Sequence, residues 1–239
     1  MQFIDTHIHL QDDKSNNATE IIRKALASGC RKMICVSAKE EDWEKIAGYT
    51  AEFPEIIVPA FAVHPWYVSE LKDNWSEHLA TMLQKYPQAL IGECGLDGLK
   101  PNIEKQKQVF AEHINLAKKH QRPLLIHAVK AVAFMEEFFD ILPEKFVIHG
   151  YNGKAEFLKK IIQKGGSIGV GKGLLKHPKA KELLTLIPRD KILFESDAPF
   201  QAEGSWQIKE IAGKVSNLLK ISPDKLSSQV YQNSLELIK

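Results

Sequence analysis

The chain has 239 residues, of which 44% are hydrophobic and 26% are charged, and its formal net charge is +2. These values are typical of a globular protein, and they exclude a disordered chain, a collagen-like fibre and a membrane protein. The longest apolar runs are about as long as a strand, so none could span a bilayer. The small charge does not suggest a dedicated nucleic-acid-binding protein, although an enzyme that contacts a few phosphates is compatible with it.

The length suits one domain with a large core, so we expect a single domain over residues 1–239. The segment Met1–Asp13 has no basic region and no long apolar stretch, and we therefore expect no signal peptide. The three cysteines, Cys30, Cys35 and Cys94, form no C-x-x-C pair, which fits a reducing compartment. The sequence therefore predicts a cytoplasmic protein with no membrane segment, and it indicates no obligate protein partner.

Short β-branched runs alternate with longer amphipathic segments along the whole chain. Eight runs are typical of strands: Phe3–Leu10, Lys32–Val36, Ile56–Val63, Ala89–Glu93, Pro123–His127, Phe146–His149, Gly166–Val170 and Lys191–Asp197. Helices are expected between them, most clearly at Ala18–Gly29, Asn102–His120, Ala155–Gly165, Gly204–Leu219 and Pro223–Ile238. Strands that alternate with helices and have nearly continuous apolar cores indicate parallel pairing.

Eight such units predict a compact (β/α)8 TIM barrel, for which this length allows about 30 residues per unit. The alternative is an open doubly wound sheet, which usually has fewer strands and often a glycine-rich phosphate loop after the first strand. Here the first strand is followed by Gln11, Asp12 and Asp13, so we favour the barrel.

The first predicted strand carries Asp5, His7 and His9 at alternate positions. A strand has a side-chain period of two, so these three residues are expected on one face. Two imidazoles on one face are close enough to bind one metal ion. They could also be hydrogen-bonded histidines in the polar mouth of a barrel, because short motifs give false positives.

Four further metal-ligand residue types stand where an apolar run ends. These are Glu93 on the fourth strand, His127 on the fifth, His149 on the sixth and Asp197 on the eighth. The carboxyl ends of barrel strands meet at one mouth, where active sites of this fold lie. Each residue alone could be a structural polar group. Together with the two histidines of the first strand, however, they exceed the ligands that one ion needs, and they suit two ions roughly 3.5–4 Å apart.

The residue types restrict the metal without naming it. Zinc and manganese accept mixed imidazole and carboxylate ligands, whereas magnesium prefers oxygen. We expect two divalent ions of the Mg, Mn or Zn kind, and the histidines disfavour a site of magnesium alone. A water between two cations loses a proton near neutral pH, which would supply a metal-bound hydroxide as nucleophile.

The candidate residues stand in six motifs that extend over essentially the whole chain: Phe3–Leu10, Ala62–Pro65, Gly92–Asp97, Gln106–Phe110 with Pro123–His127, His149–Gly153, and Glu195–Pro199. As a set these motifs resemble those of the TatD-type metal-dependent deoxyribonucleases, within the amidohydrolase superfamily. The set is specific, although no single motif is. The resemblance implies a TIM-barrel hydrolase with its metal site at the carboxyl ends of the strands.

The resemblance also implies a role for each ligand. Related amidohydrolases bridge their two ions with a carbamylated lysine from the fourth strand, but no lysine stands at that position here, and a bridging glutamate fits better. The implied ligands of the first ion are His7, His9 and Asp197. Those of the second ion are His127 and His149, and Glu93 would bridge the two ions.

Three residues are the candidates for catalysis itself. Glu93 would act through the ions that it bridges, and Asp197 could orient the attacking water and accept its proton. His64 has no metal partner in this scheme, so it could contact a substrate phosphate or protonate a leaving group. The alternative for His64 is a structural role before Pro65. Asp97 could support a ligand or simply end its loop.

Departures from the family pattern fall on the substrate side. The family usually has an arginine two residues after the fifth-strand histidine, where this chain has Val129, followed by Lys130. Trp66 replaces the second histidine of a His-Pro-His motif, and Gly98 replaces an aromatic residue. The metal ligands are therefore complete while the substrate contacts are altered, which supports a metal hydrolase more strongly than a nuclease.

Several other residues could contact a nucleic acid. Trp66, Tyr67 and Trp206 could stack on bases, although anchoring of loops is the simpler interpretation. Lys172 and Lys176 could meet phosphates, but solvated surface lysines explain them as well.

The sequence thus predicts a metal-dependent hydrolase that cleaves phosphodiester bonds, with single-stranded DNA or a small phosphodiester as substrate. Short loops offer little surface for a duplex, which favours an exonuclease. The alternative is an amidohydrolase acting on a small amide, lactone or ester at the same binuclear site. A third hypothesis, a non-catalytic binding barrel, has to be considered because one fold hosts many functions, but the intact ligand set disfavours it.

Overall fold

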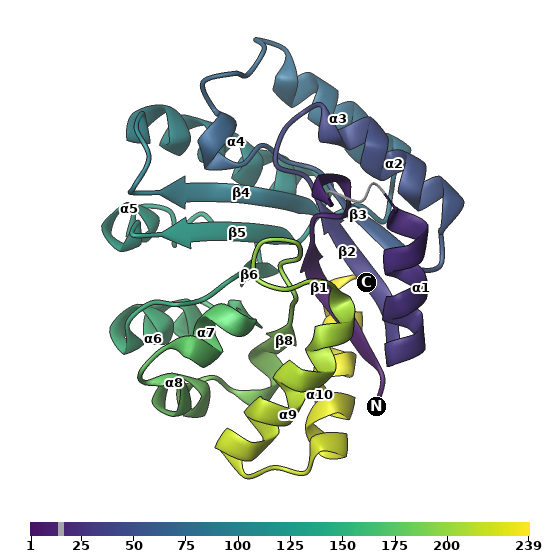
Figure 1. The fold of residues 1–239 in the computed structure, drawn as a ribbon. Coiled ribbons are helices and arrows are strands. Elements are labelled where there is room, and N and C mark those ends of the chain that lie inside the picture. Colours follow the sequence, from purple (N-terminus) through teal and green to yellow (C-terminus); the bar gives the residue numbers. More distant parts are fainter. Residues whose placement is uncertain (14–16) are drawn as a thin grey trace.

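The computed structural model describes residues 1–13 and 17–239, which alternate between strands and helices (Figure 1). The strands are β1 (Phe3–Ile8), β2 (Cys30–Val36), β3 (Ile57–Ala60), β4 (Ile91–Asp97), β5 (Leu124–Val129), β6 (Phe146–Ile148), β7 (Ser167–Val170) and β8 (Ile192–Phe194). The helices are α1 (Ala18–Ser28), α2 (Asp42–Glu52), α3 (Trp75–Lys85), α4 (Ile103–His120), α5 (Val132–Glu136), α6 (Ala155–Gln163), α7 (Lys172–Lys176), α8 (Ala180–Leu186), α9 (Ile208–Leu219) and α10 (Pro223–Leu237). Short 3-10 turns are η1 (Leu10–Asp12), η2 (Pro65–Tyr67), η3 (Arg189–Lys191) and η4 (Ser205–Gln207).

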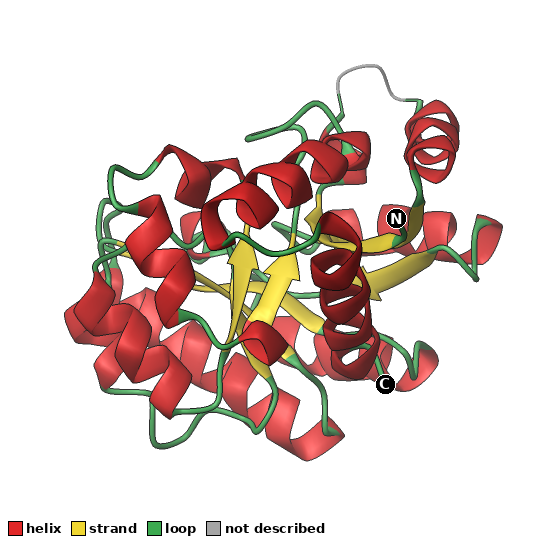
Figure 2. Ribbon diagram, turned by 90° about the horizontal axis from the view of Figure 1, so that it is seen from below, coloured by secondary structure: helices red, strands yellow, loops and turns green. Residues whose placement is uncertain are grey.

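The strands form two parallel sheets, β1-β2-β3 and β4-β5-β6-β7-β8, which two single bridges join into a ring. Ala60 pairs with Leu90 between the end of β3 and the start of β4, and Ile8 pairs with Ala198 beyond β8. Figure 2 shows the strands at the centre with helices around them. The predicted (β/α)8 barrel is therefore confirmed, and each of the eight predicted strands is present with shifted bounds.

The two ends of α1 show why the sequence predicts a helix in this segment. At the start of α1, the Asn17 side chain accepts a hydrogen bond from the Glu20 amide at 3.0 Å, which satisfies one of the free amides of the first turn. The helix ends at Gly29, whose φ of 104° is a conformation that glycine adopts readily. Its buried residues, including Ile21 and Ile22, recur at helical spacing and face the sheet.

The barrel interior below the site is filled by apolar side chains. One cluster of buried residues takes members from the strands and from the end of α10: Ile34, Val36, Val58, Ala60, Leu90, Leu125, Val147, Leu193 and Leu237. The helices pack outside the strands through a larger cluster that includes Trp43, Phe110 and Phe194. The filled interior leaves the carboxyl ends of the strands as the place where polar side chains gather.

No helix within residues 1–13 and 17–239 is long and apolar enough to cross a membrane.

His113 of α4 is buried and holds the segment that leads from β3 to His64. Its Nε2 accepts the Val63 amide at 3.1 Å, and its Nδ1 donates to the Val109 carbonyl at 2.8 Å. The bond from Val63 requires the neutral imidazole, and burial lowers the pKa of His113 to about 4. Since Val63 precedes His64, this neutral histidine fixes the segment that carries a candidate site residue.

This buried histidine should make folding stability depend on pH. Below about pH 6.5 His113 is protonated in the unfolded chain, whereas in the folded protein it stays neutral until about pH 4. The free energy of unfolding therefore falls as the pH decreases from about 6.5 towards about 4. In urea unfolding of metal-free protein, wild type should lose about 2 kcal/mol more than His113→Gln between about pH 7.5 and about pH 5. Equal losses in the two proteins would contradict this role.

Candidate metal centre

Seven side chains with metal-ligand atoms gather at the carboxyl end of the barrel. They are contributed by β1 and the residue after it, the turn after β3, β4, β5, the residue after β6 and the loop after β8. In that order they are His7, His9, His64, Glu93, His127, His149 and Asp197. All six residues predicted as metal ligands from the sequence are among them, and His64 is the seventh.

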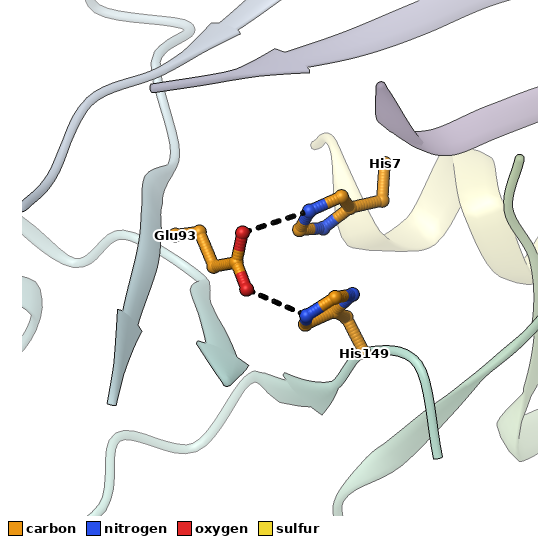
Figure 3. A group of neighbouring side chains, drawn as sticks. All are labelled: His7, Glu93 and His149. Atoms are coloured by element: carbon orange, nitrogen blue, oxygen red, sulfur yellow. Dashed lines mark hydrogen bonds and ion pairs between the residues drawn. The ribbon is translucent and has the colours of Figure 1, made fainter. Parts of the chain in front are cut away.

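Glu93 lies at the centre of the cluster and is 3% exposed. Its Oε2 lies 3.2 Å from His7 Nε2 and 3.4 Å from His9 Nε2. Its Oε1 lies 2.6 Å from His149 Nε2 and 2.7 Å from His127 Nδ1. Figure 3 shows His7 and His149 pointing at the two different oxygens of this carboxylate. Each oxygen of Glu93 therefore faces its own group of histidines.

Local backbone geometry puts Glu93 in this position. It is the third residue of β4, which continues to Asp97. The prediction that the strand ends at Glu93 was therefore wrong. Gly95 has a φ of 138°, and a Cβ there would lie 2.1 Å from the His127 carbonyl oxygen. Glycine is thus required for β4 and β5 to approach closely, and this approach brings Glu93 and His127 together.

Asp197 completes the side of the cluster formed by β1. Its Oδ1 lies 3.6 Å from His9 Nε2 and 4.0 Å from His7 Nε2, and those two ring nitrogens lie 3.2 Å apart. Asp197 has a φ of 50°, a left-handed conformation that is uncommon for a residue with a side chain. Its amide donates to the His7 carbonyl at 2.9 Å, and Gln201 Nε2 donates to its Oδ2 at 2.8 Å. Strained backbone of this kind clusters at functional sites.

The charges in the cluster are strongly coupled. Burial alone would raise the pKa of Glu93, but the nearby imidazoles of His149, His64 and His7 lower this pKa well below its usual range. Burial alone would lower the pKa of His149, but the Glu93 carboxylate raises that pKa well above its usual range. Burial lowers the pKa of His7. The site thus holds an ionised carboxylate at its centre, and this carboxylate requires nearby positive charge.

His64 lies closer to the cluster than the sequence suggested. Its Nε2 is 3.4 Å from Glu93 Oε1 and 3.1 Å from His127 Nδ1. Its Nδ1 accepts the Trp66 amide at 3.2 Å, which fixes the ring. The atoms of His64, Glu93 and His127 form one compact group with metal-ligand spacing. His64 can therefore ligate an ion as well as contact substrate, an option that the sequence analysis did not include.

Asp97 lies behind His127 and orients it. The Asp97 carboxylate accepts from His127 Nε2 at 3.4 Å and from Trp66 Nε1 at 2.7 Å. Burial raises the pKa of Asp97, but these hydrogen bonds lower it to about 2. A carboxylate that binds the far nitrogen of a histidine sets its tautomer and ring orientation. Of the two alternatives left open by the sequence, the structure favours support of a ligand.

Asp5 does not join the cluster, contrary to the expectation that it shares a face with the two histidines of β1. Its carboxylate accepts from Ser196 Oγ and Ser205 Oγ, each at 2.6 Å, and from the Ser196 amide at 2.9 Å. The pairing of β1 with β2 is irregular between Asp5 and Ile8, which breaks the strict alternation of faces. Asp5 instead joins β1 to the segment that carries Asp197.

Glu195 is a polar residue near the site that the sequence analysis left without a role. It is fully buried, its Oε1 accepts the Gly150 amide at 2.5 Å, and it lies 3.7 Å from His149 Nδ1. It therefore lies beside His149 on the side facing away from Glu93. Its place directly after the apolar run Ile192–Phe194 was the available signal.

The departures on the substrate side have a structural explanation in one case. A Cβ at Gly98 would lie 2.2 Å from the Lys130 carbonyl oxygen, and the Gly98 amide donates to the Val129 carbonyl at 2.8 Å. The turns after β4 and β5 therefore touch, and no larger side chain fits at position 98. Val129 is 37% exposed at this point of the rim.

Other residues considered for nucleic-acid contact make contacts within the protein. Lys172 Nζ donates to Gln207 Oε1 at 2.6 Å, and Lys24 Nζ lies 5.6 Å from the centre of the Trp206 ring. Tyr67 is partly buried against the main core. The contacts of Trp206 and Tyr67 fit anchoring of loops, whereas Lys172 is partly buried and hydrogen-bonded within the protein and is not a solvated surface lysine.

Comparison with known proteins agrees with the site. The model of the family described as TatD related DNase matches residues 4–239. The chain belongs to this family. The resemblance predicted from the six motifs is therefore confirmed across nearly the whole sequence.

Individual members of the family are similar to this chain in sequence and in fold. The uncharacterized metal-dependent hydrolase YjjV of Escherichia coli K12 is 29% identical over 209 residues, which cover 83% of this chain and 80% of that protein. The protein named 3'-5' ssDNA/RNA exonuclease TatD of Dickeya dadantii is 24% identical, and the match covers 76% of this chain and 72% of that protein. The crystal structure of the Escherichia coli YjjV protein superposes with a TM-score of 0.91 at 24% identity, covering 98% of this chain and 97% of that one.

Proposed function

We propose that the chain hydrolyses phosphodiester bonds, with single-stranded DNA cleaved from an end as its substrate. The observation that carries this proposal is the arrangement around Glu93, whose two oxygens face separate groups of histidines at 2.6 to 3.4 Å. Membership of the TatD related DNase family and the name of the Dickeya dadantii relative support the substrate class.

The donor set fits two divalent ions. Within residues 1–13 and 17–239 there are three compact groups of ligand atoms, and the group of His7, Glu93 and His149 shares His7 with one of the others and Glu93 with the other. The ring nitrogens of His7 and His9 face each other and the same carboxylate oxygen, an arrangement that suits lone pairs converging on a cation. Divalent ions bound here would neutralise charge on phosphoryl oxygens and acidify a coordinated water. His7, His9 and Asp197 would hold one ion, and His127 and His149, with His64, would hold the other. Glu93 would contribute to both.

The protein's own residues supply proton transfer and positioning. Burial raises the pKa of Asp197, which makes its carboxylate a better proton acceptor than an exposed one. Gln201 and the Asp197 backbone fix its orientation, so a proton could be accepted at Oδ1 while Oδ2 stays hydrogen-bonded. Burial lowers the pKa of His64 to about 4, so its imidazole is neutral and can bind a cation, which favours a ligand role over the predicted protonation of a leaving group.

The proposal is tested with metal-stripped protein and end-labelled single-stranded DNA. Stepwise shortening that needs added Mg²⁺ or Mn²⁺ and is absent in Glu93→Ala is expected, and the label position gives the polarity. The variant also controls for contaminating nuclease. DNA that stays intact with every ion would refute the nuclease and favour the amidohydrolase alternative, to be tested next with small esters, lactones and amides.

Removing the charge behind His127 should weaken the site without dismantling it. In Asp97→Asn the amide loses either both bonds from His127 and Trp66, which share Oδ2, or the bond from the Leu99 amide to Oδ1, and in both cases the negative charge behind the ring is gone. The affinity for Mn²⁺ and the cleavage rate should each fall about 10- to 100-fold, as is usual for residues that orient metal ligands. Isothermal titration with Mn²⁺ measures this, and an unchanged affinity would argue against the orienting role.

A further inference from the structure

Exposed apolar side chains gather around the metal centre. Among the described residues, the large hydrophobic side chains at the surface are Met1, Trp66, Leu99, Val129, Val132, Ile141 and Phe200. Five of these lie at or just beyond the carboxyl ends of β3, β4, β5 and β8, which are the ends that carry the site. Single exposed hydrophobic residues are ordinary, but a concentration around one mouth indicates contact with a ligand.

Trp66 stands beside one half of the centre. Its side chain is 51% exposed, and its ring lies perpendicular to His64 with centroids 5.1 Å apart. The indole N–H donates to Asp97 at 2.7 Å, which fixes the edge of the ring, while half of the side chain stays exposed. Lys100 Nζ lies over the ring, 4.2 Å from its centre, and adds positive charge to this surface.

Phe200 stands beside the other half. It is 65% exposed, and its ring meets His9 edge to face with centroids 5.0 Å apart. Its amide donates to the Asp197 carbonyl at 2.9 Å, so the ring is attached to the turn that carries the proposed proton acceptor. Each half of the cluster around Glu93 thus has one exposed aromatic ring against one of its histidines.

We propose that Trp66 and Phe200 are specificity-determining residues that stack on the two nucleobases flanking the reacting phosphodiester of an unpaired strand. This inference rests on the proposed function. A flat aromatic ring offers stacking to any base, whereas bases in a duplex have their faces covered. Val129 leaves the rim near β5 apolar. Lys100, whose Nζ lies over the Trp66 ring, supplies a cation that can pair with a backbone phosphate of a strand bound at this ring.

Stacking on Trp66 must be separated from its hydrogen bond to Asp97. The variants Trp66→Phe and Trp66→Leu both remove the indole N–H, but only the first keeps an aromatic face. Phe200→Leu removes the other ring and leaves the backbone contact. Ile141→Ala, at an exposed apolar position in the turn after α5, is the control for general loss of surface hydrophobicity.

The substrate provides the complementary change. Oligothymidylate is compared with the same strand carrying 5,6-dihydrothymidine at the two positions flanking the cleaved bond, since this saturated base keeps its polar groups but is no longer flat. For wild type, kcat/KM should fall roughly tenfold with the saturated bases, mainly through KM. Trp66→Leu and Phe200→Leu should lose a similar factor on normal strands and discriminate less between the two substrates. Ile141→Ala should behave like wild type within about threefold, and Trp66→Phe, which loses the same indole N–H as Trp66→Leu, should keep the discrimination between the two substrates that Trp66→Leu loses.

Two failures are distinguishable. If wild type cleaves both strands equally well and the leucine variants match the phenylalanine variant, stacking is refuted while the nuclease stands. If wild type with Mg²⁺ or Mn²⁺ cleaves neither strand, the proposed function is refuted and this inference with it.

Discussion

Glu93→Gln is expected to abolish the metal centre and with it the hydrolytic activity. The substitution keeps the shape of the side chain but removes the negative charge that lies within 3.4 Å of His7, His9, His64, His127 and His149. The amide offers one oxygen where the carboxylate offers two, so it could not serve as the ligand common to the two proposed ions. Cleavage of single-stranded DNA at a fixed Mn²⁺ concentration should fall by at least about a thousandfold.

A matched charge removal away from the site is the control. Glu104→Gln lies on α4, where the Glu104 side chain is 78% exposed and 3.4 Å from Lys107. This variant should keep full activity and metal affinity. A Glu93→Gln protein that retains more than about a tenth of the wild-type rate would show that Glu93 is not the shared ligand.

Asp197→Asn is expected to have the second-largest effect, and it acts differently. The amide introduced by this substitution cannot accept the proton that we assign to the raised-pKa carboxylate, while His7, His9 and Glu93 still face an ion on that side. The kcat should therefore fall about a hundred- to a thousandfold while Mn²⁺ affinity falls much less.

The dependence on metal concentration separates the two roles of Asp197. Raising Mn²⁺ to saturation should restore binding of the ions in Asp197→Asn without restoring kcat. If saturation returned the rate to that of wild type, Asp197 would be a metal ligand alone, and its assignment as proton acceptor would be wrong.

The sequence was most informative where an apolar run ends in a residue of a metal-ligand type. Apolar runs that end in His127, His149 or Asp197 predict strands with ligands at one end, because parallel barrel strands all point to the same mouth. Periodicity failed at Asp5, where irregular pairing of β1 moves the carboxylate to Ser196 and Ser205. Such irregularity depends on the neighbouring strand, so a period of two along β1 alone could not reveal it.

Contacts between loops were the other information that the sequence lacked. His64 joins Glu93 and His127, and Trp66 bonds Asp97, only because the turn after β3 folds against β4. Nothing in the residue types around position 64 distinguishes a histidine that faces the centre from one that faces solvent.

The count of bound ions tests the account most directly. Metal-stripped protein dialysed against Mn²⁺ and analysed by atomic emission should hold two ions per chain, and Glu93→Gln should hold none at the same free Mn²⁺ concentration. A wild-type protein with fewer than two ions at saturation, or a Glu93→Gln protein that keeps both, would contradict a centre built on a shared glutamate.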